Sequence, residues 1–211
     1  MSLTETSTGH PRAFSDVIGM LGDRPGARLH LGEMVEAFGD RAFGAVMFLF
    51  AIVNMLPWPP GGTTLTGAPL LFLSMELAWG RENLWLPGWL ERASVSRKTF
   101  RDLSRRFMKP ILLGERLSRP RLRFLTGPHG QGLIGIACLF LSLVLVLPIW
   151  GGNLVPAIAI GLFSLGVMQR DGVVVLLGWT VTGVSVGILV LAWRLIVDNA
   201  QASLDWLGRL F

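Results

Sequence analysis

Charged residues are scarce in this sequence of 211 residues, at 16% of the chain. A soluble domain usually carries about a quarter. The deficit lies in three stretches that are almost free of charge, Phe43–Ala78, Leu133–Gln169 and Val173–Trp193. A simple membrane-spanning helix needs about 20 apolar residues, so the third stretch predicts a single span. The first two are too long for one helix and short for two, and together the three stretches predict an integral membrane protein.

Cysteine and histidine are nearly absent. The single cysteine, Cys138, cannot form an intramolecular disulfide and lies within an apolar run. The three histidines, His10, His30 and His129, lie outside the apolar stretches. No group of His, Cys and carboxylates has metal-ligand spacing, and Ser185, within a Gly-x-Ser-x-Gly pattern, lacks the His and the acid of a hydrolase. We expect no metal, no cofactor and no enzymatic activity.

Basic residues are unevenly distributed along the chain. Of the 19 Lys and Arg residues, 12 lie between the first two apolar stretches. The positive-inside rule places this connection, residues 80–131, in the cytoplasm. A basic run is also typical of nucleic-acid binding, but its position between membrane segments favours anionic lipid head groups. We therefore expect membrane lipids as partners and no nucleic acid. The basic residues are Arg81, Arg92, Arg97, Lys98, Arg101, Arg105, Arg106, Lys109, Arg116, Arg119, Arg121 and Arg123.

Proline and glycine break both long apolar stretches. The first break is PWPPGG at residues 57–62, and the second is PIWGGN at residues 148–153. A helix does not continue through such segments. Each flanking piece has about 14 residues, or about 21 Å of helix, against a hydrocarbon core about 30 Å thick. The breaks therefore lie either inside the membrane, between re-entrant helices, or in ordinary loops at its far surface.

The two broken units resemble each other. A shift of 91 residues, which falls to 90 after the break, aligns Gly44 with Gly135, Pro57 with Pro148 and Ser74 with Ser164. The matches cluster at the breaks, which favours a true internal duplication over chance similarity of two Gly-rich apolar segments. The sequence therefore predicts two related halves.

Paired broken helices at corresponding positions of two halves indicate a transport site. After each break a new helix opens with unpaired N–H groups, which attract anions. The expected ligand is therefore an anionic or lipid-linked substrate. The residues expected to bind it are Asn54, Pro57, Pro60, Gly61, Gly62, Thr63, Thr64, Pro148, Gly151, Gly152 and Asn153.

Four charged residues near the ends of the broken units are candidates for coupling or gating, namely Glu76, Arg41, Arg170 and Asp171. Glu76 is the one acid well inside an apolar unit, and intramembrane acids are costly and usually functional. It also lies close to Trp79 and Arg81 in the sequence, which fits a side chain that extends to the membrane boundary. The sequence leaves both interpretations of Glu76 open.

Six short motifs resemble the ExoD family of bacterial membrane proteins, which is named for exopolysaccharide synthesis. They are FGDRAFG at 38–44, LPWPPGG at 56–62, WLP at 85–87, RPRL at 119–122, GGNLVPA at 151–157 and QRDG at 169–172. The sequence departs from the family pattern at Phe38, where we expect Leu, and at Glu76, where we expect an uncharged polar residue. The resemblance implies a protein of the bacterial inner membrane linked with exopolysaccharide production and tolerance of alkaline conditions. It carries over no catalytic residues.

We therefore expect an all-α integral membrane protein, built as a single membrane domain over residues 1–211. Its expected segments are an amphipathic, interfacial N-terminal region at 1–42, a first hairpin at 43–79, the basic connection at 80–131, a second hairpin at 132–170 and a C-terminal transmembrane helix at 173–197.

The leading functional hypothesis is a multi-pass transporter or lipid flippase-like protein that supports polysaccharide production. Alternatives are a non-transporting scaffold for polysaccharide enzymes, and an ion or proton exchanger. Gly183 and Gly187 form a small-residue face of the last span, which would allow a homodimer.

Overall fold

The computed structural model describes residues 14–56, 62–81, 84–117, 122–147 and 153–208. Within these ranges the chain is predominantly helical, as the sequence predicts. In chain order the elements are α1 (Phe14–Asp23), β1 (Arg28–His30), α2 (Leu31–Phe38), the 3₁₀ helix η1 (Gly39–Arg41), α3 (Ala42–Asn54), α4 (Gly62–Ala78), α5 (Gly88–Glu91), β2 (Ser94–Ser96), α6 (Arg97–Leu117), the 3₁₀ helix η2 (Arg123–Leu125), α7 (Pro128–Val146), α8 (Leu154–Gln169) and α9 (Gly172–Gly208).

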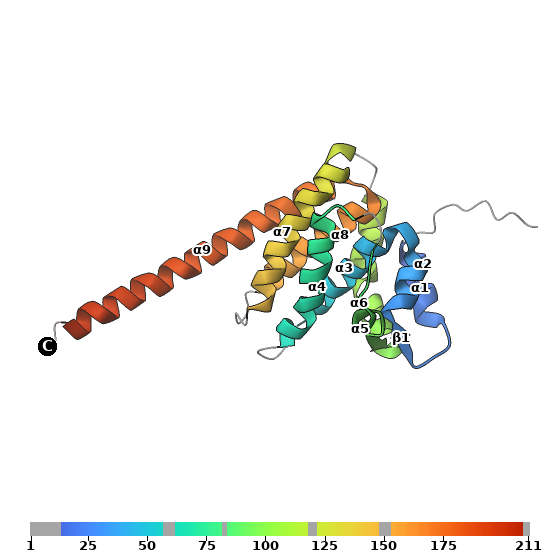
Figure 1. Cartoon of the computed structure of the whole chain (residues 1–211), viewed down its shortest axis with the longest axis horizontal. Helices are drawn as coiled ribbons and strands as arrows, with labels where there is room; N and C mark the ends of the chain where they lie inside the picture. Colours follow the sequence, from blue (N-terminus) through green and yellow to red (C-terminus); the bar gives the residue numbers. More distant parts are fainter. Residues whose placement is uncertain (1–13, 57–61, 82–83, 118–121, 148–152, 209–211) are drawn as a thin grey trace, which may run out of the picture.

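Two helical hairpins form the body of the molecule (Figure 1). The first comprises α3 and α4, the second comprises α7 and α8, and in each pair a Pro/Gly segment separates the two helices in the sequence. The hairpins pack so that α4 lies against α7 and α3 lies against α8, and α9 then packs against α8. The central helix is α3, which is apolar on all sides and in which Ala45, Val46 and Met47 are at most 1% exposed.

Small residues bring the two hairpins close together. A Cβ atom at Gly44 of α3 would lie only 2.8 Å from the carbonyl oxygen of Ser164 in α8, and one at Gly135 of α7 would overlap the backbone of Ala78 in α4. Near the middle of the α4–α7 interface, the hydroxyl oxygens of Ser74 and Ser142 are 3.4 Å apart. Such small-residue contacts are typical of helices that pack in membranes, because they let the backbones approach.

An amphipathic layer of α1, α2 and α6 covers one side of α3. The rings of Phe14 in α1 and Phe38 in α2 have centroids 5.1 Å apart, and Phe14 packs against Phe48 of α3 at 5.7 Å. The Arg-rich helix α6 turns an apolar face to the bundle, since Phe100 is 2% exposed and Leu103 packs against the core. The basic connection is therefore folded onto the bundle.

A two-stranded antiparallel ladder ties the start of this layer together. It pairs Arg28 with Ser96, Leu29 with Val95 and His30 with Ser94, so β1 and β2 lie side by side. Three-residue strands this far apart give no periodic signal in the sequence. At one end of the ladder the N–H of Leu31, the first residue of α2, donates to the carbonyl oxygen of Ala93, and at the other end the N–H of Arg97, the first residue of α6, donates to that of Ala27.

Exposed large apolar side chains gather on α7 and α9. Those on α7 include Leu133, Ile136, Phe140 and Leu143, and those on α9 include Leu191, Trp193, Leu195 and Ile196. Within the described ranges, only α7 and α9 are long and apolar enough to cross a membrane, whereas α3, α4 and α8 have 13, 17 and 16 residues. The predicted C-terminal span lies inside the longer α9, which projects away from the bundle (Figure 1).

Candidate functional site

The first turn of α4 touches the end of α7. The hydroxyl of Thr64 donates a hydrogen bond of 2.9 Å to the carbonyl oxygen of Val146, the last residue of α7. One turn further along α4, a Cβ at Gly67 would lie 3.3 Å from the Val146 side chain. These contacts place the start of α4 next to the end of α7, at the end of the bundle where α3 also ends and α8 begins (Figure 1).

Asn54 fastens the first hairpin at its break. Its side chain is 2% exposed. The Nδ2 atom donates to the carbonyl oxygens of Phe50 at 2.8 Å and Thr66 at 3.1 Å, and Oδ1 accepts from the hydroxyl of Thr66 at 2.9 Å. The side chain thus ties the last turn of α3 to the first turns of α4, and its polar atoms are satisfied inside the fold.

The other residues predicted at the breaks are described only in part. Gly62 is the first residue of α4, Thr63 follows it, and Asn153 immediately precedes α8 without capping it through its side chain. The remaining predicted residues lie outside the described ranges, namely Pro57, Pro60, Gly61, Pro148, Gly151 and Gly152.

Glu76 lies in the last turn of α4 and is 3% exposed. Its Oε1 atom is 3.3 Å from Nη1 of Arg81, whose side chain is 54% exposed. Its Oε2 atom is buried and has no hydrogen-bond partner among the described residues. The carboxylate of Glu76 therefore lies inside the fold, whereas Arg81 reaches the surface, and both roles expected for Glu76 stay predictions.

The other three candidate coupling residues mark helix ends. Arg41 ends the 3₁₀ turn that leads into α3. Arg170 ends α8 in a left-handed conformation, with φ of 53°. Asp171 is 2% exposed, and its Oδ1 accepts the backbone N–H of Val173 at 2.9 Å, so it caps the start of α9.

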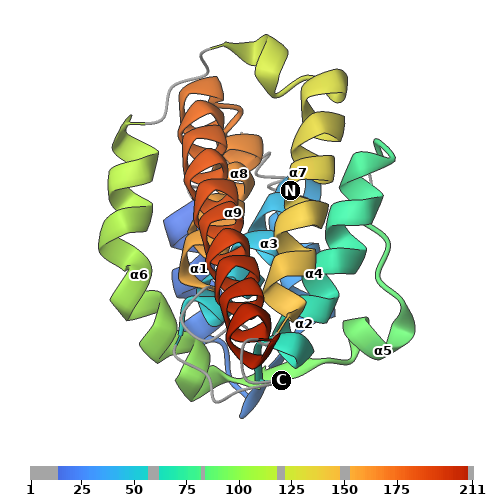
Figure 2. The ribbon, with the colours of Figure 1, turned by 90° about the vertical axis from the view of Figure 1, so that its left-hand side faces the viewer.

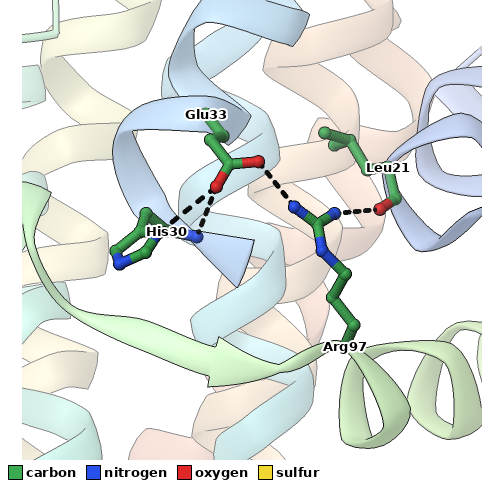
Figure 3. A network of polar contacts seen from close by, with 4 residues as sticks. All are labelled: Leu21, His30, Glu33 and Arg97. Carbon is green, nitrogen blue, oxygen red and sulfur yellow. Dashed lines mark hydrogen bonds and ion pairs between the residues drawn. The ribbon is translucent and has the colours of Figure 1, made fainter. Parts of the chain in front are cut away.

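A polar network that the sequence did not reveal joins α1, α2 and α6 (Figure 3). Arg97, the first residue of α6, donates through Nη1 to the carbonyl oxygen of Leu21 at 2.7 Å and through Nη2 to Oε2 of Glu33 at 2.8 Å. The other carboxylate oxygen of Glu33 accepts the backbone N–H of His30 at 3.3 Å and lies 3.2 Å from Nδ1 of its ring. The hydrogen bond from Arg97 is the main reason that the pKa of Glu33 lies below its ordinary value.

Two apolar helices of membrane-crossing length, a bundle held by small-residue contacts and a charged amphipathic layer are features of a helical membrane protein. The family model described as exopolysaccharide synthesis, ExoD, matches residues 14–191, and the chain belongs to this family. The resemblance seen in the sequence motifs is thereby confirmed, and the family links the chain to exopolysaccharide synthesis.

Two relatives illustrate the similarity. Protein ExoD of Rhizobium meliloti is 29% identical over 174 residues, which cover 80% of this chain and 72% of that protein. The uncharacterized protein slr1875 of Synechocystis sp. is 23% identical over 189 residues, which cover 86% of this chain and 89% of that protein. No solved structure matches the chain.

Proposed function

We propose that the protein moves an anionic, lipid-linked substrate of exopolysaccharide synthesis at the bacterial inner membrane. The observation that carries this proposal is the contact between Thr64 and Val146, which puts the start of α4 beside the second break. Helix starts present N–H groups without intrahelical partners, and these groups favour anions. Two such starts at one end of the bundle would form a shared anion-binding region.

We also propose that the two hairpins are related repeats. Gly44 of α3 faces Met168 of α8, and Gly135 of α7 faces Ala78 of α4. The two units align in the sequence with a shift of 91 residues before the break and 90 after it. This alignment takes Gly44 to Gly135 and Ala78 to Met168, so the two contacts are equivalent. Such an exchange of partners is expected when two copies of a hairpin pack around a pseudo-twofold axis, and this architecture is common among transporters.

Cysteine labelling tests the proposed site. In a Cys138→Ala background, Thr64→Cys and Asn153→Cys variants would be labelled with a membrane-impermeant maleimide, added to inside-out or right-side-out membrane vesicles. We expect both positions to react from both sides, because a transport site opens alternately. His129→Cys is the control and should react from one side only, because His129 lies at the start of α7, whereas Thr64 contacts the last residue of that helix. Reaction of Thr64→Cys and Asn153→Cys from a single side would contradict the proposal and make the breaks surface loops.

An ion or proton exchanger is the second candidate function, because Glu76 buries a carboxylate whose ion-pair partner, Arg81, reaches the surface. Such an exchanger would lose its activity when Glu76 is replaced by Gln, which keeps the shape of the side chain and removes its charge. Ion or proton flux in reconstituted vesicles that is equal for wild type and Glu76→Gln would rule out this role. The non-transporting scaffold stays the third candidate; it predicts that substitutions at Gly62 leave complementation of polysaccharide production intact.

A further inference from the structure

The outer face of α6 carries a row of exposed cations. Asp102 is the single exposed acid among them. The opposite face of the helix is buried, with Phe100 at 2% and Ile111 at 1% exposure. Figure 2 shows α6 at the edge of the molecule, with its outer side uncovered. The five cations of the row are Lys98, Arg101, Arg105, Arg106 and Lys109.

The row is continuous and carries five cations against one acid. Lys98, Arg101, Arg105 and Lys109 follow one another at intervals of three or four residues, which aligns them on one face over about 16 Å of helix. Within the part of the chain that the structure describes, none of the five cations takes part in an ion pair. Like charges held this close create a positive field that attracts anions.

The chemistry of this face excludes hydrocarbon as its neighbour. Charged side chains are costly in the bilayer core, and α6, the helix that carries the row, runs along the side of the bundle (Figure 2). The side formed by α6 therefore faces water or lipid head groups. The large apolar side chains that hydrocarbon would cover are exposed on α7 and α9 instead.

We propose that the outer face of α6 is a docking surface for anionic phospholipid head groups. A protein partner would need an apolar core with large anchoring side chains, and no described side chain from Lys98 to Lys109 is a large exposed apolar one. Head groups are mobile anions that need no shaped pocket. A bilayer is within reach because the same chain carries α7 and α9.

The test measures binding of two lipid probes to the purified full-length chain in nonionic detergent. Energy transfer from tryptophan to dansyl-phosphatidylglycerol reports anionic lipid, and dansyl-phosphatidylcholine is the zwitterionic comparison. The row variant is R101Q/R105Q/K109Q. The matched control is R24Q/R28Q/R92Q, which removes the same number of charges from exposed residues outside α6. Equal melting temperatures would show that both variants fold.

We expect wild type and control to bind phosphatidylglycerol more tightly than phosphatidylcholine at low salt, and this preference to fall as salt is added. Each cation near an anionic surface contributes about fivefold, so the row variant should lose about 100-fold in affinity for phosphatidylglycerol. Equal affinity of the row variant and wild type would overturn the proposal. A row variant that binds phosphatidylglycerol normally but fails to restore polysaccharide production would assign this face to an acidic protein instead.

Discussion

Arg97 and Glu33 are joined by a hydrogen bond of 2.8 Å between Nη2 and Oε2, although 64 positions separate them in the sequence. The side chain of Arg97 is 5% exposed and that of Glu33 is 31% exposed. Because Arg97 also donates to the carbonyl oxygen of Leu21, one side chain holds α1, α2 and α6 together. One buried cation thus links all three helices of the amphipathic layer.

Replacing Arg97 with Lys should lower the free energy of unfolding by about 1–3 kcal/mol, because a single ammonium group does not reproduce the planar fork that reaches two acceptors. Thermal unfolding of the purified protein measures the change. Arg101→Lys is the control, since Arg101 is exposed on the same helix and makes no ion pair within the described ranges. Equal melting temperatures for the two variants would show that the fork of Arg97 does not stabilise the layer.

The contribution of Glu33 should depend on pH. Its pKa in the folded protein lies below the ordinary value of 4.5, first because of the hydrogen bond from Arg97. A depressed pKa stabilises the fold fully above the unfolded-state pKa, and this stabilisation is lost as pH falls through the folded-state pKa. The melting-temperature difference between wild type and Glu33→Gln should therefore be constant near neutral pH and shrink below about pH 4.5. A difference that stays constant down to pH 3 would contradict the assignment.

Adding one methyl group at either glycine contact should separate the hairpins. Gly44→Ala and Gly135→Ala should each destabilise the protein, although alanine favours a helix over glycine by about 1 kcal/mol, because the new Cβ would meet the backbone of α8 or α4. Gly183→Ala is the control, since nothing lies within 4 Å of its added Cβ. We expect the melting temperature of the control to be unchanged or higher than that of wild type. An equal fall in melting temperature for all three variants would show that the close contacts at Gly44 and Gly135 are not the cause of the destabilisation.

Asn54→Ala should weaken the end of the first hairpin. The substitution removes three hydrogen bonds and leaves the part-buried hydroxyl and carbonyl of Thr66 with fewer partners, which typically costs about 1–3 kcal/mol. Hydrogen exchange at the start of α4 should rise more than at the start of α9. Asn199→Ala offers a comparison, because its side chain is exposed and donates to a carbonyl oxygen four residues earlier in its own helix. Unchanged exchange in α4 would contradict the role of Asn54.

The apolar stretches and their breaks predicted α3, α4, α7, α8 and the first two thirds of α9, because composition and Pro/Gly placement act locally. Which of these elements pack against each other could not be predicted from the sequence, because the pairing of α4 with α7 or of Arg97 with Glu33 depends on contacts between residues distant in sequence. For the candidate site, the sequence located both breaks but gave no sign that Thr64 would reach Val146. The roles of the break residues in transport stay a prediction.

The length of α9 has a consequence for the whole bundle. Its 37 residues extend for about 55 Å, whereas the hydrocarbon core of a bilayer is about 30 Å thick. A helix longer than the hydrocarbon core fits a bilayer by tilting or by extending beyond it. Since the first part of α9 packs against α8, which in turn packs against α3, a tilt of α9 turns the hairpins with it. The thickness of the surrounding bilayer would then help to set the angle at which the paired breaks meet the membrane.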